Sequence, residues 1–402
     1  MSARRSHERA VGLLRAVLNR LVVDGAIRVR LPDDEFVVGE PGREPDVTIR
    51  VADPSAMARS FARGGTIGFA EAYIDGTWDT DDLARLLEIA ARSHDRRRHT
   101  GIWEGTMRFS RAAWNRLRPG VGTTAVKTMV EHYDLGNDFY AAWLDPTMSY
   151  SSAIFDDGED LETAMRTKYE RLAERAGIRR GDRVLEIGCG WGSMAEYLAS
   201  ELDCTVTAVT ISREQAAYVE ARMERDGLQD RVDVSITDFR QITGAYDRIV
   251  SIEMIESIDE ESWPELFTVI ERSLVPGGTA ALQVITIDHD LHRQLVGRDD
   301  FIRAYIFPGG ALPSTKVLRR LGDDVGLEWA GLSTHGTSYA RTLAEWDRRF
   351  VAAWPEILRR SPQFDELFFR MWRFYLAYSQ AGFATGRIDG VQVVYRKPAA
   401  DE

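Results

Sequence analysis

Residues 184–192 read Val-Leu-Glu-Ile-Gly-Cys-Gly-Trp-Gly, and this stretch decides the fold prediction. A short apolar segment, 183–187, carries one acid, Glu186, and runs directly into a turn with glycine at every second position. Glycine lacks a Cβ, so such a turn lets the backbone approach a ligand closely. In parallel sheets, ligands bind at the carboxyl ends of strands, beside the amino terminus of the next helix. The stretch therefore predicts a strand, a ligand-binding turn and a helix.

The same alternation continues outward from this stretch. We expect strands at 183–187, 205–211, 232–235, 248–252 and 279–287, and helices at 191–201, 213–226, 261–273 and 314–321. A later strand pair, 326–333 and 391–396, is expected to close the sheet. Short apolar strands that alternate with helices predict a parallel sheet covered on both faces.

The glycine spacing distinguishes this turn from a dinucleotide-binding turn. It reads E-x-G-x-G-x-G, whereas the dinucleotide pattern is G-x-G-x-x-G. It resembles the S-adenosylmethionine motif of the class I methyltransferases, which implies a Rossmann-like α/β fold. The resemblance implies that Glu186 contacts the amino end of the methionine moiety and that Gly188, Gly190 and Gly192 lie beside the cofactor.

Further cofactor contacts are expected after the next two strands. The acid that normally follows the second strand and holds the ribose hydroxyls is absent here. Thr210, Ser212 and Gln215 stand there and can form hydrogen bonds instead. After the third strand, Asp238 and Phe239 are candidates to bracket the adenine; alternatively, Asp238 is an ordinary turn or cap residue.

Composition and charge exclude several classes of protein. The chain has 402 residues, 44% of them hydrophobic and 28% charged, which fits one or two globular domains and not wholesale disorder. No apolar run reaches the roughly 18–20 residues that a bilayer crossing needs. The amino-terminal residues are interrupted by charges, so we expect no secretory signal.

Cysteine content and net charge exclude further classes of protein. The two cysteines, Cys189 and Cys204, are too few for a disulfide framework or a four-ligand zinc site, so we expect no metal and a cytoplasmic protein. The net charge of −12 argues against a general nucleic-acid binder.

The amino-terminal part carries local basic patches. Residues 9–22 place Val11, Leu14, Leu18, Leu21 and Val22 on one helical face and arginines on the other. This face fits either an anionic membrane or the protein's own core. The arginines of 92–98 lie in a stretch with little apolar periodicity, which we interpret as a linker or exposed loop. We therefore expect a small amino-terminal domain at 1–100, a linker at 101–124 and a catalytic domain at 125–402.

A helical insertion is expected at 341–380. Its aromatic residues are Trp346, Phe350, Trp354, Phe364, Phe368, Phe369, Trp372, Phe374, Tyr375 and Tyr378. A stripe of this kind is typical of a core, and beside a ligand-binding sheet it also fits the wall of an apolar tunnel.

Six segments occur in the order of one family, the cyclopropane fatty acid synthases and mycolic acid cyclopropane synthases, which the chain resembles over roughly 125–396. They are 132–155 (HYDLGNDFYAAWLDPTMSYSSAIF), 185–192 (LEIGCGWG), 209–215 (VTISREQ), 247–256 (DRIVSIEMIE), 305–314 (YIFPGGALPS) and 370–383 (RMWRFYLAYSQAGF). Residues 66–90 resemble the family's smaller amino-terminal domain. This identifies a seven-stranded catalytic domain with a helical lid.

The resemblance implies a reaction. Members of this family transfer the methyl group of S-adenosylmethionine to the double bond of an unsaturated acyl chain of a phospholipid. The methylated chain carries a positive charge, which aromatic faces can stabilise. A base then removes a proton and the cyclopropane ring closes.

In the family the base is a bound bicarbonate, held by a cysteine, a glutamate, a histidine, an isoleucine backbone and a tyrosine. Carried over residue by residue, Glu256, Ile285 and Tyr375 match the glutamate, the isoleucine and the tyrosine. Ser152 stands at the cysteine position and Gln283 at the histidine position. Both can donate hydrogen bonds but neither carries a positive charge. Bicarbonate is therefore expected to be held less firmly, or to be replaced by another base.

The candidate protein bases are Glu253 and Glu256, because desolvation raises a carboxyl pKa toward the range of a general base. Alternatively, Glu253 only caps the next helix. Tyr133, Tyr150 and Ser151 are our candidates for further contact with the cofactor, the two tyrosines closing a lid over it; alternatively, the tyrosines only pack.

Several functions stay open at this point. A hydride shift before proton loss would give a methylene- or methyl-branched chain instead of a ring. The same fold also serves natural-product methyltransferases, and loss of the cysteine and histidine motivates an inactive lipid-binding homologue. We expect a homo-oligomer that attaches peripherally to the inner face of the membrane.

Overall fold

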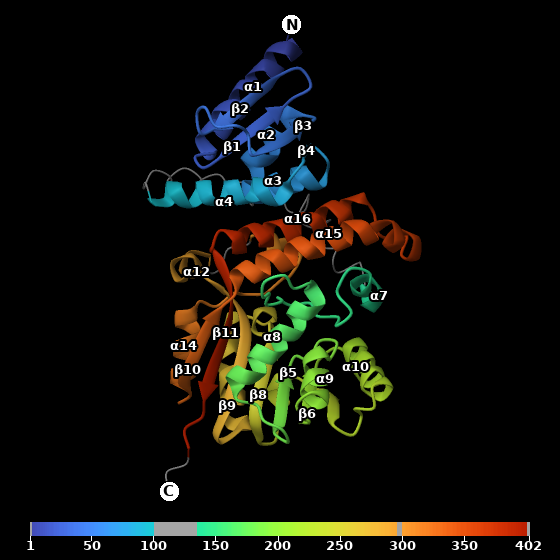
Figure 1. Cartoon of the computed structure of the whole chain (residues 1–402). Helices are drawn as coiled ribbons and strands as arrows, with labels where there is room; N and C mark the ends of the chain where they lie inside the picture. The colour runs from blue at the N-terminus through green and yellow to red at the C-terminus, as the bar shows by residue number, and fades with distance from the viewer. Residues whose placement is uncertain (1, 100–134, 296–299, 400–402) are drawn as a thin grey trace. The chain divides into compact units, whose positions relative to one another are not determined.

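The computed structural model describes residues 2–99, 135–295 and 300–399, and it divides into two compact units. The first unit comprises 1–134, 298–308 and 350–385; the second comprises 135–297, 309–349 and 386–402. Both are shown in Figure 1, coloured along the chain. The predicted linker at 101–124 and Tyr133 lie outside the described residues. The predicted domain limits stay a prediction.

The second unit is built on a seven-stranded sheet with strand order β10-β11-β9-β8-β5-β6-β7. The strands are β5 (Arg183–Ile187), β6 (Thr205–Thr210), β7 (Val232–Ile236), β8 (Tyr246–Ile252), β9 (Leu274–Ile287), β10 (Glu328–Thr334) and β11 (Ile388–Arg396). Neighbours from β7 to β9 pair in parallel, and β11 runs antiparallel to both β9 and β10. The predicted mostly parallel α/β sheet is confirmed.

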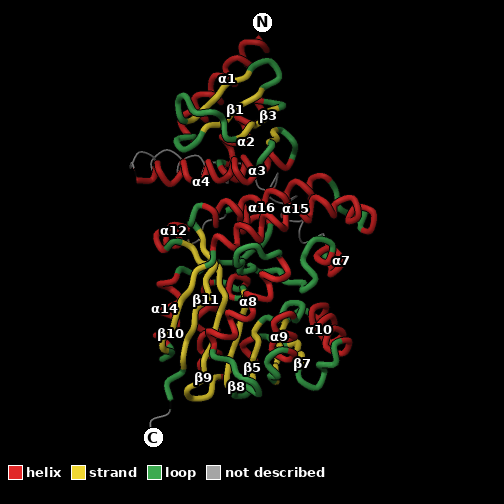
Figure 2. The backbone as a smooth tube through the Cα atoms, in the orientation of Figure 1, coloured by secondary structure: helices red, strands yellow, loops and turns green. Residues whose placement is uncertain are grey.

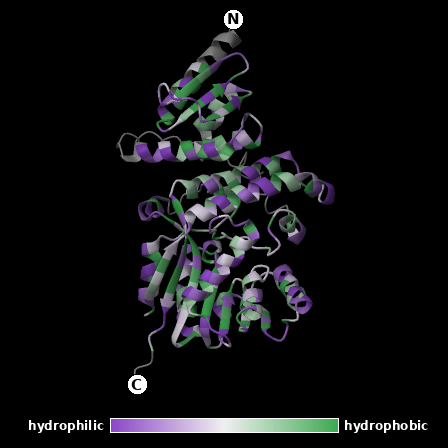
Figure 3. Cartoon of the chain, viewed as in Figure 1, coloured by the Kyte–Doolittle hydropathy of each residue, from purple (hydrophilic) through white to green (hydrophobic). Residues whose placement is uncertain are grey.

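Helices cover this sheet on two faces, each with its own apolar core (Figure 2). On one face lie α8 (Leu161–Ala176), α9 (Ser193–Ser200) and α10 (Arg213–Arg225), and on the other lie α11 (Trp263–Ser273) and α14 (Thr315–Asp324). Successive residues of one strand enter opposite cores: Val184 packs with the first group of helices and Leu185 with the second. The hydropathy colouring in Figure 3 shows runs of apolar residues in the strands and alternating apolar and polar residues along the helices.

Short elements surround the carboxyl ends of the strands. They are α7 (Gly136–Ala141), α12 (His289–Leu295) and the 3-10 helices η1 (Phe239–Gln241), η2 (Ile255–Ser257) and η3 (Glu260–Ser262). The long helix α15 (Gly336–Arg360) begins in this unit and continues into the other.

The first unit holds a four-stranded sheet with order β2-β1-β3-β4. Its elements are α1 (Ser2–Leu21), β1 (Ala26–Arg30), β2 (Glu35–Gly39), β3 (Val47–Val51), α2 (Pro54–Gly64), α3 (Thr66–Ile74), β4 (Trp78–Thr80), α4 (Leu83–His99), α13 (Phe301–Tyr305) and α16 (Glu366–Ala384). Helix α16 packs against α3 and α4, although nearly 300 residues separate Arg370 from Tyr73, whose carbonyl it contacts. The unit is therefore assembled from distant parts of the chain.

The structure answers two questions about the basic segments. The apolar face of α1 packs on its own unit, because Leu14 and Val22 are buried and Arg15 lies over the ring of Phe36. The interpretation of 92–98 as a loop is wrong, since α4 runs through to His99. Arginine is a good helix former, and the buried Ser93 anchors this end by accepting hydrogen bonds from the backbone of Val23 and Asp24.

The aromatic insertion forms α15, α16 and their connection. Its aromatic rings pack on one another, for example Phe364 on Phe368 at 4.6 Å and Trp354 on Phe369 at 5.0 Å between centroids. This packing is that of an apolar core; the tunnel stays a prediction. Among the helices that the structure describes, none has both the length and the apolar character that a bilayer crossing requires.

Candidate functional site

The glycine turn after β5 has the conformation that its sequence predicts. Gly188, Gly190 and Gly192 have φ angles of +83°, +52° and +84°, a region that side chains rarely adopt. A Cβ on Gly188 would meet Met254 at 2.8 Å and one on Gly192 would meet Val219 at 2.7 Å. At Gly190 no described atom lies within 4 Å of that position. The first and last glycines therefore allow close packing within the protein, and the middle one borders open space that a ligand can fill.

Glu186 lies at the carboxyl end of β5, just before this turn. It is buried, and its Oε2 has no hydrogen-bond partner among the described residues. Burial raises the pKa of this carboxyl to about 8. A cation beside a buried carboxyl group, such as the ammonium of an amino acid, stabilises the charged form of that group and gives its free oxygen a partner. The turn and this acid together fit the amino-acid end of S-adenosylmethionine.

The remaining predicted cofactor residues already have partners within the protein. The Thr210 hydroxyl bonds Gln215 at 2.7 Å, and Ser212 caps α10 by accepting from the Gln215 backbone at 3.2 Å. Asp238 caps η1 and pairs with Arg240. The buried Phe239 packs in the apolar core under that same arginine. Their contact with the cofactor stays a prediction.

A second polar group gathers around Glu253, directly after β8. The Glu253 Oε1 accepts from the Ser152 backbone at 2.9 Å and from Gln283 Nε2 at 3.0 Å, and Oε2 accepts from the Tyr339 hydroxyl at 2.6 Å. The Glu253 backbone N–H also donates to the Gln283 carbonyl at 2.8 Å. We call Ser152, Glu253, Gln283 and Tyr339 the carboxylate cluster. The carboxylate thus has three donors, so it does more than cap a helix.

The backbone of Glu253 is strained. Its φ is +50°, one of three positive values among the described residues other than glycine. Conformations of this kind persist only where the surroundings impose them, and they concentrate at functional sites. Here the bonds of the carboxylate cluster impose it.

Glu256 lies one turn further along, and its Oε1 accepts from the Ile285 backbone N–H. Its Oε2 is buried without a partner among the described residues. Burial, followed by repulsion from Glu253, raises the pKa of Glu256 to about 8, and burial raises the pKa of Glu253 as well. Three donors, two of them on side chains, favour the charged form of Glu253, whereas two backbone N–H groups, of Ile285 and of Glu256 itself, favour that of Glu256. Of this pair, Glu253 is therefore the carboxyl whose charged form has more hydrogen-bond support.

Two fully buried side chains, Gln392 and Lys168, interact with members of the carboxylate cluster. Gln392 on β11 donates to Gln283 Oε1 at 3.1 Å and to the Lys168 carbonyl at 3.3 Å. Lys168 donates to the Ser151 hydroxyl at 2.8 Å, and its charge interacts with Glu253, Glu186 and Asp145. Burial lowers the pKa of Lys168 to about 8, so it remains mainly charged at neutral pH.

Tyr339, Lys168 and Gln392 were not among the residues predicted from the sequence. The signal for Lys168 and Gln392 was a polar residue inside an otherwise apolar helix face or strand. Tyr375 belongs to the first unit, where its ring packs on Trp372 and Phe307, so its place beside Glu256 stays a prediction. Tyr150 packs among Tyr140 and Trp346, and its closure over a cofactor stays a prediction too.

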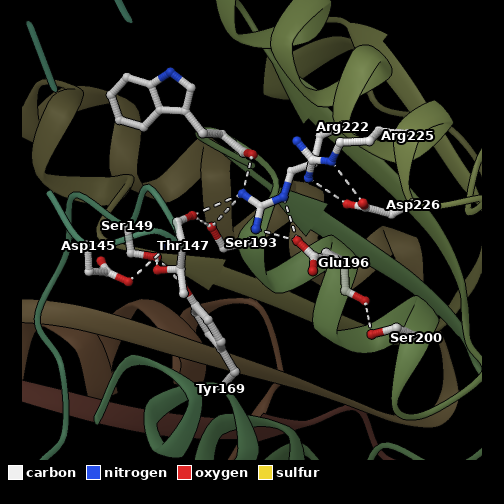
Figure 4. A network of polar contacts seen from close by, with 11 residues as sticks. Asp145, Thr147, Ser149, Tyr169, Ser193, Glu196, Ser200, Arg222, Arg225 and Asp226 are labelled. Atoms are coloured by element: carbon white, nitrogen blue, oxygen red, sulfur yellow. Dashed lines mark hydrogen bonds and ion pairs between the residues drawn. The ribbon is translucent and has the colours of Figure 1, made fainter. Parts of the chain in front are cut away.

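The segment that carries Ser151 and Ser152 is fixed by a polar network (Figure 4). The buried guanidinium of Arg222 donates to the carbonyls of Thr147 and Trp191 at 2.9 and 3.2 Å, and it pairs with Glu196. Ser193 also donates to the Thr147 carbonyl. One arginine on α10 therefore contacts both the glycine turn and the 145–152 segment.

Comparison with known proteins gives a consistent result. The family model described as mycolic acid cyclopropane synthetase matches residues 122–393. A tuberculostearic acid methyltransferase of Mycobacterium tuberculosis is 36% identical over 396 residues, which cover 94% of this chain and 90% of that protein. A cyclopropane-fatty-acyl-phospholipid synthase of Escherichia coli is 34% identical over 351 residues, 87% of each chain.

Solved structures show the same fold. A mycolic acid cyclopropane synthase in complex with SAH (S-adenosylhomocysteine) and CTAB superposes with a TM-score of 0.61 at 27% identity, over 69% of this chain and 99% of that one. A coclaurine N-methyltransferase bound to SAH has a TM-score of 0.63 at 22% identity, which shows the fold alone.

Proposed function

This chain belongs to the mycolic acid cyclopropane synthetase family of S-adenosylmethionine-dependent methyltransferases, and we propose that it methylates the double bond of an unsaturated acyl chain of a phospholipid. The observation that carries the proposal is the carboxylate cluster: a half-buried glutamate, held by three donors, at the carboxyl edge of the sheet. The glycine turn, 188–192, lies at the same edge, and we call it the cofactor turn.

When bound, S-adenosylmethionine supplies an electrophilic methyl group. Glu186 would hold its ammonium, since the Oε2 of this acid is buried without a partner among the described residues. Gly190 leaves the space beside it open. These residues hold and orient the methyl donor; the acid–base work belongs to the carboxylate cluster.

Glu253 is the proposed base. Once the acyl chain carries the new methyl group and a positive charge, one C–H bond must break, with its electron pair retained by the chain and its proton transferred to a base. The Glu253 carboxylate, oriented by Ser152, Gln283 and Tyr339, accepts that proton. Glu256 stays protonated beside it. In this proposal Glu253 does the work of the bicarbonate in other members of the family.

For the product, we favour a methylene-branched chain, which is the alkene that this proton loss leaves; a saturated methyl branch would need a separate reductant to add hydrogen to it. A base that acts after a hydride shift gives the branch, and one that acts before it gives the ring. Ser152 and Gln283 depart from the cysteine and histidine that accompany bicarbonate-dependent ring closure, and the methyltransferase relative is covered over 90% of its length. The ring is the second candidate, favoured by the Escherichia coli relative.

We further propose that the protein acts at the inner face of the membrane as a peripheral protein and a homo-oligomer. Its phospholipid substrate resides in a bilayer. Arg92 and Arg96 pair with Glu88 and Asp24 but keep 47% and 62% of their side chains exposed, so they can attract anionic headgroups. Flotation with anionic and neutral liposomes at low and high salt tests the first point, and light scattering tests the second. Equal binding to both liposomes at every salt concentration would exclude electrostatic attachment.

The decisive experiment incubates the protein with S-adenosylmethionine carrying a deuterated methyl group and a monounsaturated phospholipid. Mass analysis of the released acyl chains should show a gain of one labelled carbon. Proton NMR of the product made with unlabelled S-adenosylmethionine then separates the two structures, because cyclopropane protons resonate upfield of all others and an exocyclic methylene appears among the vinyl protons. Transfer to a soluble acceptor but not to phospholipid would support a natural-product methyltransferase, and no transfer at all would support an inactive homologue.

A further inference from the structure

Arg222 lies where three segments of the second unit meet. It projects from α10 and is 7% exposed. Its Nη1 atom donates to the Thr147 carbonyl at 2.9 Å, to the Trp191 carbonyl at 3.2 Å and to the Ser193 hydroxyl at 3.3 Å (Figure 4). One nitrogen thus bridges the 145–152 segment and the cofactor turn. No other described side chain donates to both of these carbonyls, and the other nitrogens of the planar guanidinium pair with Glu196 at the same time.

The Thr147 carbonyl is the fixed point of its segment. It receives a second donor, the Ser193 hydroxyl, from the first residue of α9. The next residue, Met148, is buried and has a φ of +59°, so the chain turns sharply there in a conformation that costs free energy. The Asp145 carboxylate holds the Thr147 N–H at 2.9 Å on the other side. The turn is therefore maintained from α9, α10 and Asp145 together.

The segment leads from this fixed point to the proposed base. Ser149 bonds the Tyr169 hydroxyl, and Ser151 accepts from Lys168. The Ser152 N–H then donates to Glu253, and its carbonyl accepts from Gln283. A displacement of Thr147 would move residues 148–152 as well. It would therefore shift the Ser152 N–H, which orients the Glu253 carboxylate.

We propose that Arg222 is a positioning residue that couples the cofactor turn to the carboxylate cluster and so sets the geometry between the methyl donor and Glu253. This rests on the proposed function, in which the turn holds the donor and Glu253 takes the proton. The coupling runs in both directions: a ligand that fixes the turn also orders the 145–152 segment. A misplacement of about 1 Å between reacting groups can reduce a rate by roughly a hundredfold.

Three variants separate positioning from simple structural support. Arg222→Lys keeps a positive charge, but with one nitrogen in place of three it cannot hold both carbonyls and Glu196 at once. Glu196→Gln removes the ion pair and leaves the Nη1 bridge. Ser193→Ala removes the second donor to Thr147 and one acceptor of Arg222 Nη1 but leaves the bridge between the two carbonyls, and it covers the case in which Arg222→Lys does not fold.

The experiment measures hydrogen exchange of 145–152 with and without S-adenosylhomocysteine, together with its affinity, the melting temperature, and kcat and KM on unsaturated phospholipid. We expect the ligand to slow exchange of the segment about tenfold or more in the natural protein and in Glu196→Gln, and less than about threefold in Arg222→Lys. We expect kcat of Arg222→Lys to fall roughly 10- to 100-fold, with ligand affinity within about threefold. For Ser193→Ala we expect a ligand-induced protection and a kcat between those of the natural protein and those of Arg222→Lys.

Two outcomes would overturn the inference: full ligand-induced protection with normal kcat in Arg222→Lys, or equal losses in Arg222→Lys and Glu196→Gln that follow the melting temperature. A natural protein that shows ligand-induced protection without methylating phospholipid would refute the proposed function and leave the coupling intact.

Discussion

The cofactor turn and the carboxylate cluster lie at the same edge of one sheet, yet they relate differently to sequence. The turn, 188–192, follows directly after its strand, and its three glycines can be recognised in nine consecutive residues. The carboxylate cluster draws Ser152, Glu253, Gln283 and Tyr339 from four separate parts of the chain. A local motif thus predicts a binding function, whereas the chemistry that we propose to follow binding depends on contacts between distant residues. The predictions below test whether binding and chemistry are separable in this way.

The largest expected effect is on chemistry. Glu253→Gln keeps the size of the side chain and removes its basic oxygen, so turnover should fall roughly 10²–10⁴-fold while S-adenosylmethionine affinity stays unchanged. Steady-state kinetics and calorimetry measure the two quantities. Glu256→Gln is the matched control and should cost less, because that carboxyl already holds a proton. If Glu256→Gln proves the more damaging variant, the two glutamates must exchange roles.

Next comes binding. Gly190→Val should reduce S-adenosylmethionine affinity by about a hundredfold or more, because its side chain fills the space that the ligand needs and its φ of +52° strains any residue with a Cβ. Gly227→Val is the control: its φ is +69° and its Cβ also meets no described atom, but it follows α10, away from the turn. Calorimetry should give normal affinity for the control. Normal affinity in Gly190→Val would remove the turn from the binding site.

The pH dependence of binding sharpens the comparison. The pKa of Glu186 is about 8 in the free protein, so this carboxyl is protonated at pH 7. A bound ammonium lowers that pKa, so binding at pH 7 should release about one proton and affinity should rise about tenfold per pH unit up to about pH 8. Calorimetry in buffers of different ionisation enthalpy measures the release. It should vanish in Glu186→Gln and persist in Glu256→Gln; release that persists in Glu186→Gln would assign it to another group.

The smallest effect concerns added bicarbonate. Because Glu253 already occupies the donors of Ser152 and Gln283, depletion of bicarbonate should change turnover less than about threefold. The combination of Ser152→Cys, Gln283→His and Glu253→Gly should make turnover bicarbonate-dependent if the pocket keeps its shape. Strict dependence in the natural protein would show that serine and glutamine hold the anion as neutral donors and that Glu253 is not the base.

Sequence reasoning predicted the sheet of the second unit nearly strand by strand, because buried parallel strands such as 183–187 are short apolar runs bounded by turns. It misread 92–98, where one buried serine and a run of arginines gave no apolar period. It placed Glu253 and Gln283 among the candidate catalytic residues, but it could not assign Tyr339 to the same site. Its hydroxyl reaches Glu253 from a helix 86 residues further along the chain, and neither residue carries a local mark of that contact.

The first unit has a consequence for synthesis of the protein on the ribosome. Its sheet and α1–α4 are complete by His99, but α16, which packs on α3 and α4, ends only at Ala384. At about 5–20 residues per second, roughly 15 to 60 s separate the emergence of these two parts. During that time the surfaces of α3 and α4 that will receive α16 have no permanent partner, and the second unit's strands are being made. Nascent chains should therefore depend on a chaperone at this surface until the last helix arrives, and truncation before residue 385 should expose it permanently.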